Sequence, residues 1–114
     1  MKVGHDMEEI PRIQKILERK PQFAARILTA RELEKFHSYT GRRQAEFLAG
    51  RYTAKEAFSK AFGTGIGKIS FQDIEVLNDE YGVPQITKSP YTKGEQQVSI
   101  THTKHNASAV VILM

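Results

Sequence analysis

Cysteine is absent from the 114 residues of this chain, and so is any long apolar run. Without cysteine the chain forms neither disulfide bonds nor a thiolate zinc site, and nothing in its chemistry calls for an oxidising compartment. No segment approaches the ~20 apolar residues of a membrane span, and charge follows the first residues too soon for a signal peptide. We therefore expect one cytoplasmic domain over residues 1–114, without a membrane partner.

Acidic residues are outnumbered by basic ones, with a formal net charge of +4 and a pI of about 9.4. Lysine and arginine concentrate before residue 69, whereas residues 72–82 carry acids and no cation. The basic surface is therefore expected on one side of the molecule. Such a surface suits an anionic partner, such as nucleic acid, a phosphorylated cofactor or an acidic protein.

The hydrophobic pattern places most helices before most strands. We expect helices over residues 8–19, after the capping-box pattern Thr29-Ala-Arg-Glu32, and over residues 43–62. Strands are expected at residues 71–77 and 83–87, joined as a hairpin, and at residues 97–101 and 108–114, paired with each other. With a short first strand at residues 1–5, this order predicts an α+β fold of helices packed on a small, mainly antiparallel sheet.

Two familiar ligand-binding motifs are absent. The glycine-rich segment 63–67 precedes a lysine, but a Walker phosphate loop needs glycine and Ser or Thr where Phe62 and Ile69 stand. A helix also precedes the segment, which excludes the dinucleotide fingerprint. The four histidines have no metal-binding spacing, so a zinc site has little support. His102, at the end of an expected strand, is more simply a polar turn residue.

Two carboxylates remain as candidates for metal chemistry. Asp6 follows the expected first strand, and Glu56 lies off the apolar stripe of the long helix. Oxygen ligands from separate elements suit Mg²⁺, which is typically shared with substrate phosphates. The plainer alternatives are that Asp6 caps the first helix and that Glu56 forms a surface ion pair with Lys60.

A basic stripe accompanies the apolar face of the first helix. Arg12, Lys15 and Arg19 recur at helical spacing, with Ile16 beside them. The plainer alternative is an ordinary solvated face.

Motifs along nearly the whole chain resemble a known family, bacterial holo-[acyl-carrier-protein] synthase, a 4'-phosphopantetheinyl transferase. The resemblance is carried by Gly4-His5-Asp6, Phe47-Leu-Ala-Gly-Arg51, Ala54-Lys-Glu-Ala-Phe-Ser-Lys-Ala61, Gly63-Thr-Gly65 and Ser99-Ile-Thr-His-Thr103. It implies transfer of the 4'-phosphopantetheine arm of coenzyme A to a serine of apo acyl carrier protein, with release of adenosine 3',5'-bisphosphate. Neither nucleic acid nor a membrane is an implied partner.

The resemblance also implies roles for individual residues. Asp6 and Glu56 resemble the Mg²⁺ ligands, and Lys60 joins them as a catalytic residue. Coenzyme A contacts are implied for Lys60, Gly63, Thr64, Gly65 and His102. The basic stripe, with Ile16 beside it, is expected to dock the acidic carrier protein through Arg12, Lys15, Ile16 and Arg19. The serine proton would pass to Glu56 or to water held by the metal.

A homotrimer with active sites between subunits is the assembly that the resemblance implies. Here the first strand begins about two residues late, so we expect a short strand that holds Asp6 less firmly. His5, which precedes Asp6, is expected to alter the pH dependence. Two other classes of function stay open at this point: a small basic module that binds RNA or another polyanion, and a structural or assembly protein.

Overall fold

The structure is a computed structural model that describes residues 1–114. Its helices and strands follow one another in this order: β1 (Lys2–Glu9), α1 (Ile10–Arg19), α2 (Phe23–Ile27), α3 (Ala30–His37), α4 (Arg42–Phe62), the 3-10 helix η1 (Phe71–Asp73), β2 (Glu75–Asn78), β3 (Pro84–Lys88), β4 (Gln96–His102) and β5 (Asn106–Leu113).

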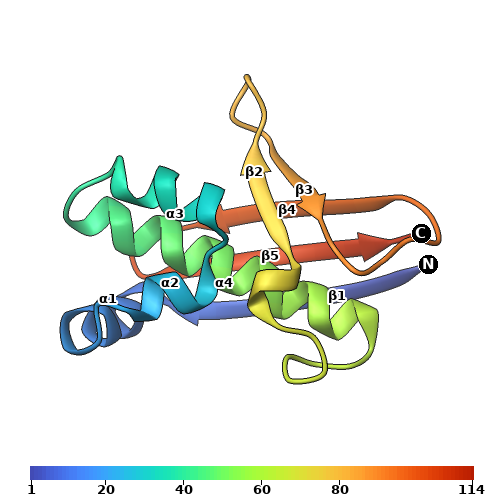
Figure 1. Ribbon diagram of the computed structural model, residues 1–114, viewed down its shortest axis with the longest axis horizontal. Helices are drawn as coiled ribbons and strands as arrows, with labels where there is room; N and C mark the ends of the chain where they lie inside the picture. The colour runs from blue at the N-terminus through green and yellow to red at the C-terminus, as the bar shows by residue number, and fades with distance from the viewer.

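Helix α4 is the centre of the molecule. It lies across a three-stranded antiparallel sheet of order β1-β5-β4, while α1, α2 and α3 gather around its first half (Figure 1). Thirteen of its 21 residues are buried, far more than one apolar stripe would give. The first and last strands of the chain pair along their whole length, so the two termini lie close together (Figure 1). No helix is both long and apolar enough to cross a membrane.

The sheet and α4 approach each other through residues without large side chains. A Cβ atom at Gly4 of β1 would lie 1.9 Å from the carbonyl oxygen of Ala57 and 2.7 Å from the nitrogen of Ala61. Real Cβ atoms do not come this close to other atoms, so only glycine fits there. Strand β1 therefore rests directly on the backbone of α4, next to the turn that carries Glu56 and Lys60.

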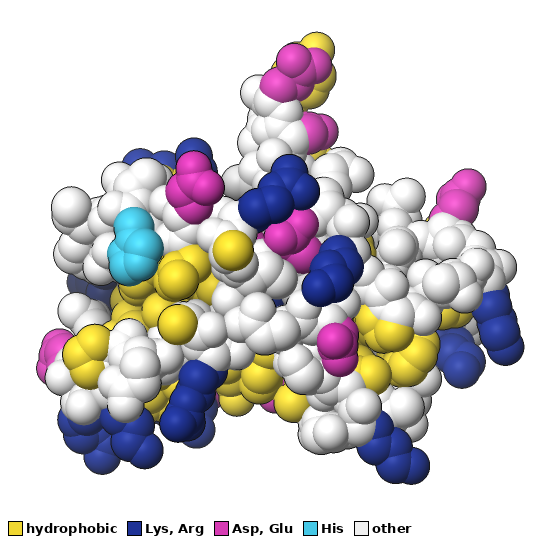
Figure 2. All heavy atoms as spheres, viewed as in Figure 1, with side chains coloured by type: hydrophobic (Ala, Val, Ile, Leu, Met, Phe, Trp, Pro, Cys, Tyr) yellow, Lys and Arg dark blue, Asp and Glu magenta, His cyan; other side chains and the backbone are white.

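Strands β2 and β3 form a separate two-stranded hairpin. The hairpin projects from the body of the molecule, and acidic side chains gather near its tip (Figure 2). Lys and Arg side chains gather at the end of the body where α1 lies, and others lie at the opposite end and below the hairpin, so this view does not confirm the expected one-sided basic surface (Figure 2).

The α+β class, both expected strand pairings and the three expected helices are confirmed. Two expectations about elements are wrong, and one helix is additional. Strand β1 is eight residues long and fully paired with β5. Residues 71–73 form a 3-10 helix because Ser70 and Asp73 cap it as a reciprocal pair. Helix α2 is short and was not expected, since five residues after Pro21 are too few to show a helical period.

A buried ion pair holds the helices and the hairpin together. The side chains of Lys55 and Glu32 are both 0% exposed, with Lys55 Nζ 2.6 Å from Glu32 Oε1. Lys55 also donates to the carbonyl oxygens of Ile27 at 2.7 Å and Phe71 at 3.0 Å, so all three of its protons are used. Glu32 accepts in turn from the backbone N–H of Val76 at 2.7 Å. The pair thus links α2, α3, α4, η1 and β2.

Truncating Lys55 should destabilise the fold strongly. Lys55→Ala leaves the Glu32 carboxylate buried without its cation, which we expect to lower the free energy of unfolding by about 3–5 kcal/mol. The matched control is Glu46→Ala, which breaks the exposed pair of Arg42 and Glu46 and should cost less than about 1 kcal/mol. Urea unfolding followed by circular dichroism measures both. Equal losses in the two variants would contradict the role given to the buried pair.

Candidate functional site

Asp6 and Lys60 meet where β1 crosses α4. Asp6 lies within β1, paired with Ala109 of β5, and the close approach at Gly4 brings its side chain against α4. Lys60 Nζ donates to Asp6 Oδ1 at 3.0 Å and to the carbonyl oxygen of His5 at 3.0 Å. The Asp6 side chain is 16% exposed, while that of Lys60 is 53% exposed. The lysine is therefore accessible from solvent while bonded to β1.

Glu56 lies one helical turn before Lys60 and is half-buried. Burial raises the pKa of the Glu56 carboxyl, and the neighbouring carboxylates of Asp6 and Glu8 raise it further, while Lys60 lowers it. Two carboxylates thus oppose each other at this place. A cation between them would remove the repulsion.

The pair fits a hard divalent cation in one further respect. Asp6 Oδ2 is buried and has no hydrogen-bond partner, although buried carboxylate oxygens are normally satisfied. No cluster of three or more His, Cys, Asp or Glu side chains suited to a metal occurs in the chain. A cation held here would therefore have two carboxylate ligands and would take the rest from water and substrate, which is how Mg²⁺ is commonly bound.

The plainer alternatives for these carboxylates do not describe the structure. Asp6 does not cap α1, because the helix begins at Ile10 after Glu9. Glu56 does not form an ion pair with Lys60, whose carboxylate partner is Asp6. The Asp6 side chain bonds Lys60 and repels the Glu56 carboxylate, so the three side chains form one group.

The glycine turn follows directly on this end of α4. Gly63 caps the helix in the left-handed conformation, with φ of 94°, and donates its N–H to the carbonyl oxygen of Ser59 at 3.0 Å. Gly65 also has a positive φ, of 69°, and donates to the same oxygen. Gly63 and Thr64 are exposed. The turn therefore offers backbone close to Lys60 without a bulky side chain in the way.

The basic stripe lies on α1 as the spacing predicts. Arg12, Lys15 and Arg19 are exposed and Ile16 is half-buried among them. Arg12 is bound to Glu8 of β1, with Arg12 Nη1 2.7 Å from Glu8 Oε1. The Glu8 carboxylate raises the pKa of Arg12. One end of the stripe is thereby tied to the strand that carries Asp6.

His102 lies apart from the carboxylates. At the end of β4 it lines a hollow of about 170 Å³ together with Arg43, Gly50 and Arg51. Asp6, Glu56 and Lys60 do not line this hollow. Within one chain, the hollow therefore does not join His102 to the carboxylate pair.

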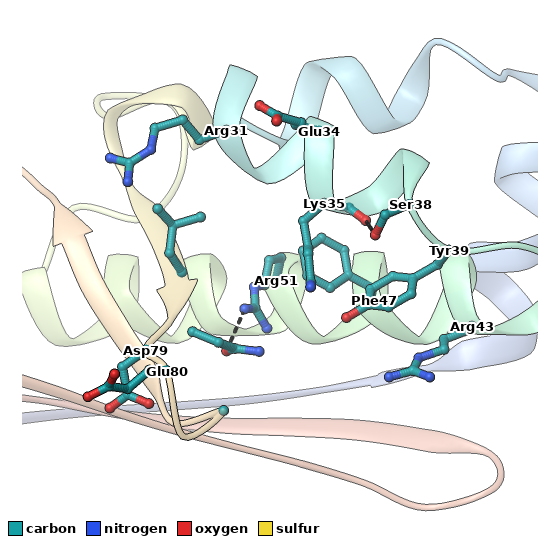
Figure 3. A pocket seen from close by; sticks show the side chains of 13 residues that line it. Arg31, Glu34, Lys35, Ser38, Tyr39, Arg43, Phe47, Arg51, Asp79 and Glu80 are labelled. Atoms are coloured by element: carbon teal, nitrogen blue, oxygen red, sulfur yellow. Dashed lines mark hydrogen bonds between the residues drawn. The ribbon is translucent and has the colours of Figure 1, made fainter.

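A larger cavity of about 740 Å³ opens between α3, α4 and the β2–β3 hairpin. It shares Arg43 and Arg51 with the hollow at His102. Arg31 and Lys35 of α3 add two more cations, while Asp79 and Glu80 come from the hairpin (Figure 3). Arg51 is held in place by Asn78, at 2.8 Å from its Oδ1. The lining of this polar cavity thus carries four cations and three acids, the third acid being Glu34 of α3.

These four cations are not among the residues expected at the site. Arg51 is part of a motif quoted above and Arg43 stands in a run of two arginines, but nothing in their spacing places them together. The cavity is assembled from α3, α4 and the hairpin, so its lining depends on packing between segments distant in the sequence.

Replacing Glu56 should stabilise the metal-free protein and abolish its response to Mg²⁺. The raised pKa means that the folded state binds the proton more tightly than the unfolded chain, so the ionised group costs stability above its folded pKa. Glu56→Gln should therefore raise the Tm at pH 7, with the difference disappearing at about pH 4, near the ordinary value. With Mg²⁺ at about 100 times its Kd, the free energy of unfolding of wild type should rise by about 2.7 kcal/mol. That of the variant should not change.

Differential scanning fluorimetry with and without Mg²⁺ measures these effects. Glu18→Gln is the matched control, since Glu18 is exposed on α1 and its loss should change neither quantity. An unchanged Mg²⁺ response in Glu56→Gln would contradict the assignment of the carboxylate pair.

Holo-[acyl-carrier-protein] synthases are similar to this chain in both sequence and fold. Holo-[acyl-carrier-protein] synthase of Streptococcus uberis is 50% identical over 115 residues, covering 99% of this chain and 97% of its own length. That of Streptococcus pyogenes serotype M5 is 51% identical with the same coverage. The sequence matches the model of the 4'-phosphopantetheinyl transferase superfamily over residues 2–113.

Solved structures agree with these relatives. A holo-(acyl-carrier-protein) synthase from Bacillus anthracis, in complex with CoA (3',5'-ADP), is 47% identical, with a TM-score of 0.89 over 96% of this chain and 92% of its own. The Helicobacter pylori enzyme in complex with coenzyme A is 33% identical, with a TM-score of 0.84 over 96% of this chain and 97% of its own. With its sequence matched from residue 2 to residue 113, this chain belongs to the 4'-phosphopantetheinyl transferase superfamily.

Proposed function

We propose that this chain is a holo-[acyl-carrier-protein] synthase, which transfers the 4'-phosphopantetheine arm of coenzyme A to a serine of apo acyl carrier protein in a Mg²⁺-dependent reaction. Relatives of that name at about 50% identity over nearly the full length support the activity. Mg²⁺ dependence is supported by the mutual repulsion of the Asp6 and Glu56 carboxylates. It is also supported by Asp6 Oδ2, which is buried without a hydrogen-bond partner.

The reaction moves one phosphoryl group. The serine Oγ forms a bond to the phosphorus that bears the pantetheine, the P–O bond of the pyrophosphate breaks, and adenosine 3',5'-bisphosphate leaves with the electron pair. Mg²⁺, when bound, supplies positive charge to the pyrophosphate oxygens. Lys60, exposed and adjacent to Asp6, contributes a second positive charge to the leaving phosphate. The serine proton passes to Glu56 or to water beside it.

Coenzyme A binds beside this centre. Lys60 and the turn at Gly63, Thr64 and Gly65 contact its phosphates, since exposed backbone at a glycine turn allows close approach. His102 and the cations of the polar cavity, contributed by the neighbouring subunit, bind the nucleotide end, because phosphates are recognised by arginine and lysine. The carrier protein, which is acidic, docks on the basic stripe of Arg12, Lys15 and Arg19 with Ile16 as its apolar contact.

The assembly is a homotrimer, in which the carboxylate pair of one subunit faces His102 of the next. Two observations support it. His102 and the carboxylates line different parts of the surface in one chain. Val3 and Met7 on β1 and Val110 on β5 are exposed on the sheet, and exposed apolar surface of this kind favours association.

Membership of a transferase family favours the enzyme over the polyanion-binding module and over a purely structural protein. We place the reaction in the cytoplasm. A chain without cysteine has no disulfide bond that a reducing compartment would break.

Mass spectrometry of an apo carrier protein incubated with coenzyme A, Mg²⁺ and this protein tests the activity. We expect one phosphopantetheine adduct on the carrier, and none when Mg²⁺ is chelated. Asp6→Asn should lower kcat/KM by roughly 10²–10³, because it removes one of the two carboxylates that would hold the Mg²⁺ ion, whose charge stabilises the transition state. Failure of wild type to form the adduct with Mg²⁺ present would end the proposal, and full turnover by Asp6→Asn would end the role of Asp6.

Mixing two inactive variants tests the shared active site. Glu56→Gln loses the carboxylate and His102→Ala loses the coenzyme A contact, but a mixed trimer contains interfaces that keep both intact groups. After co-refolding at equal amounts, about a quarter of the sites should be intact if subunits mix at random. The measurement is the initial rate of carrier modification, with each variant alone as control. No recovery, together with a monomeric mass by light scattering, would contradict the arrangement.

A further inference from the structure

The polar cavity and the hollow at His102 share four side chains: Tyr39, Arg43, Phe47 and Arg51. Three of them stand at four-residue spacing on α4, so they line up along one face of the helix. Tyr39 comes from the loop between α3 and α4 and lies next to this row (Figure 3). The two hollows are therefore contiguous along these side chains.

Each of the two arginines rests on an aromatic ring. The guanidinium carbon of Arg43 lies 4.5 Å from the centroid of the Tyr39 ring, and that of Arg51 lies at the same distance from the centroid of Phe47. The two rings also pack against each other, with centroids 5.6 Å apart and planes 56° apart. Phe47 belongs to the hydrophobic core, and Tyr39 packs against that core. Both rings are thus fixed supports for a cation.

The two arginines differ in what else holds them. Arg51 is buried and donates to the carbonyl oxygen of Val76 at 3.1 Å and to Asn78 Oδ1 at 2.8 Å. Arg43 is exposed and takes part in none of the ion pairs of the chain. A ring contacts the flat face of a guanidinium and leaves the N–H groups at its edge available to an anion. Of the two, Arg43 is therefore the arginine that can give its donors to a phosphate.

We propose that Tyr39 is a positioning residue for coenzyme A: its ring holds the guanidinium of Arg43 where the two hollows meet, so that Arg43 binds a phosphate of the nucleotide end. The inference rests on the proposed function, because it assumes that coenzyme A binds in the polar cavity. Arginine has a long side chain that loses rotamer freedom when it binds. A ring that restricts the side chain beforehand reduces this loss, and binding is stronger for it.

Two substitutions of Tyr39 separate the aromatic ring from simple packing. Tyr39→Leu keeps an apolar contact with Phe47 but does not attract a guanidinium, so Kd for adenosine 3',5'-bisphosphate should rise roughly 2- to 5-fold. Tyr39→Phe keeps the ring, so its Kd should stay within about 1.5-fold of wild type. Isothermal titration calorimetry measures both. In turnover, Tyr39→Leu should raise KM for coenzyme A by the same factor and leave kcat unchanged, since the contact is made before and during the reaction alike.

A double-mutant cycle shows whether the effect passes through Arg43. In an Arg43→Gln background, Tyr39→Leu should change Kd less than about 1.5-fold, because the cation that the ring holds is already absent. The matched background is Arg31→Gln, since Arg31 lines the same cavity but its side chain is bonded to Glu75. There Tyr39→Leu should keep its full cost.

Equal losses in the two backgrounds would mean that Tyr39 acts by packing alone and would overturn the inference. An equal loss in Tyr39→Phe and Tyr39→Leu would overturn it as well, and so would a wild type that does not bind the nucleotide. If wild type binds the nucleotide but transfers nothing to an apo carrier, the proposed function fails instead, and the cycle in Kd still decides the role of Tyr39.

Discussion

The fold depends above all on one ion pair that water does not reach. Lys55 and Glu32 are fully buried, and burial lowers the pKa of the lysine while the Glu32 carboxylate partly restores it. Ions leave water at a high cost unless every donor and acceptor finds a partner. Here the partners come from α2, η1 and β2. Helices and hairpin must therefore assemble together, since no part satisfies the pair alone.

The same buried ion pair fixes how α4 is turned about its own axis. Residues 55 and 56 are consecutive, so their side chains leave the helix about 100° apart. Once Lys55 is held inside, Glu56 must point toward β1, where Asp6 lies. A contact chosen for stability thus also sets the direction of a group proposed for metal binding, and Gly4 removes the last obstacle to the approach of β1.

The sequence predicts the parts of this molecule that depend on local order. The capping box at Thr29, the glycine end of α4 and both strand pairings are confirmed because each is decided by neighbouring residues. The length of β1 is not local, since it is set by pairing with a strand about one hundred residues later. The polar cavity is likewise made by packing of distant segments. Roles for Asp6 and Glu56 came from motif resemblance, and their proximity required the structure.

Lys60 has a second relation to β1 that concerns the sheet itself. Strand β1 lies at one edge of the sheet, where unpaired carbonyl and N–H groups invite pairing with another strand. The Lys60 ammonium group donates a hydrogen bond to one of these carbonyl oxygens, that of His5. It also places a positive charge beside the edge. The lysine proposed to contact coenzyme A thus also disfavours edge-to-edge pairing with another strand, as lysine on a sheet edge generally does.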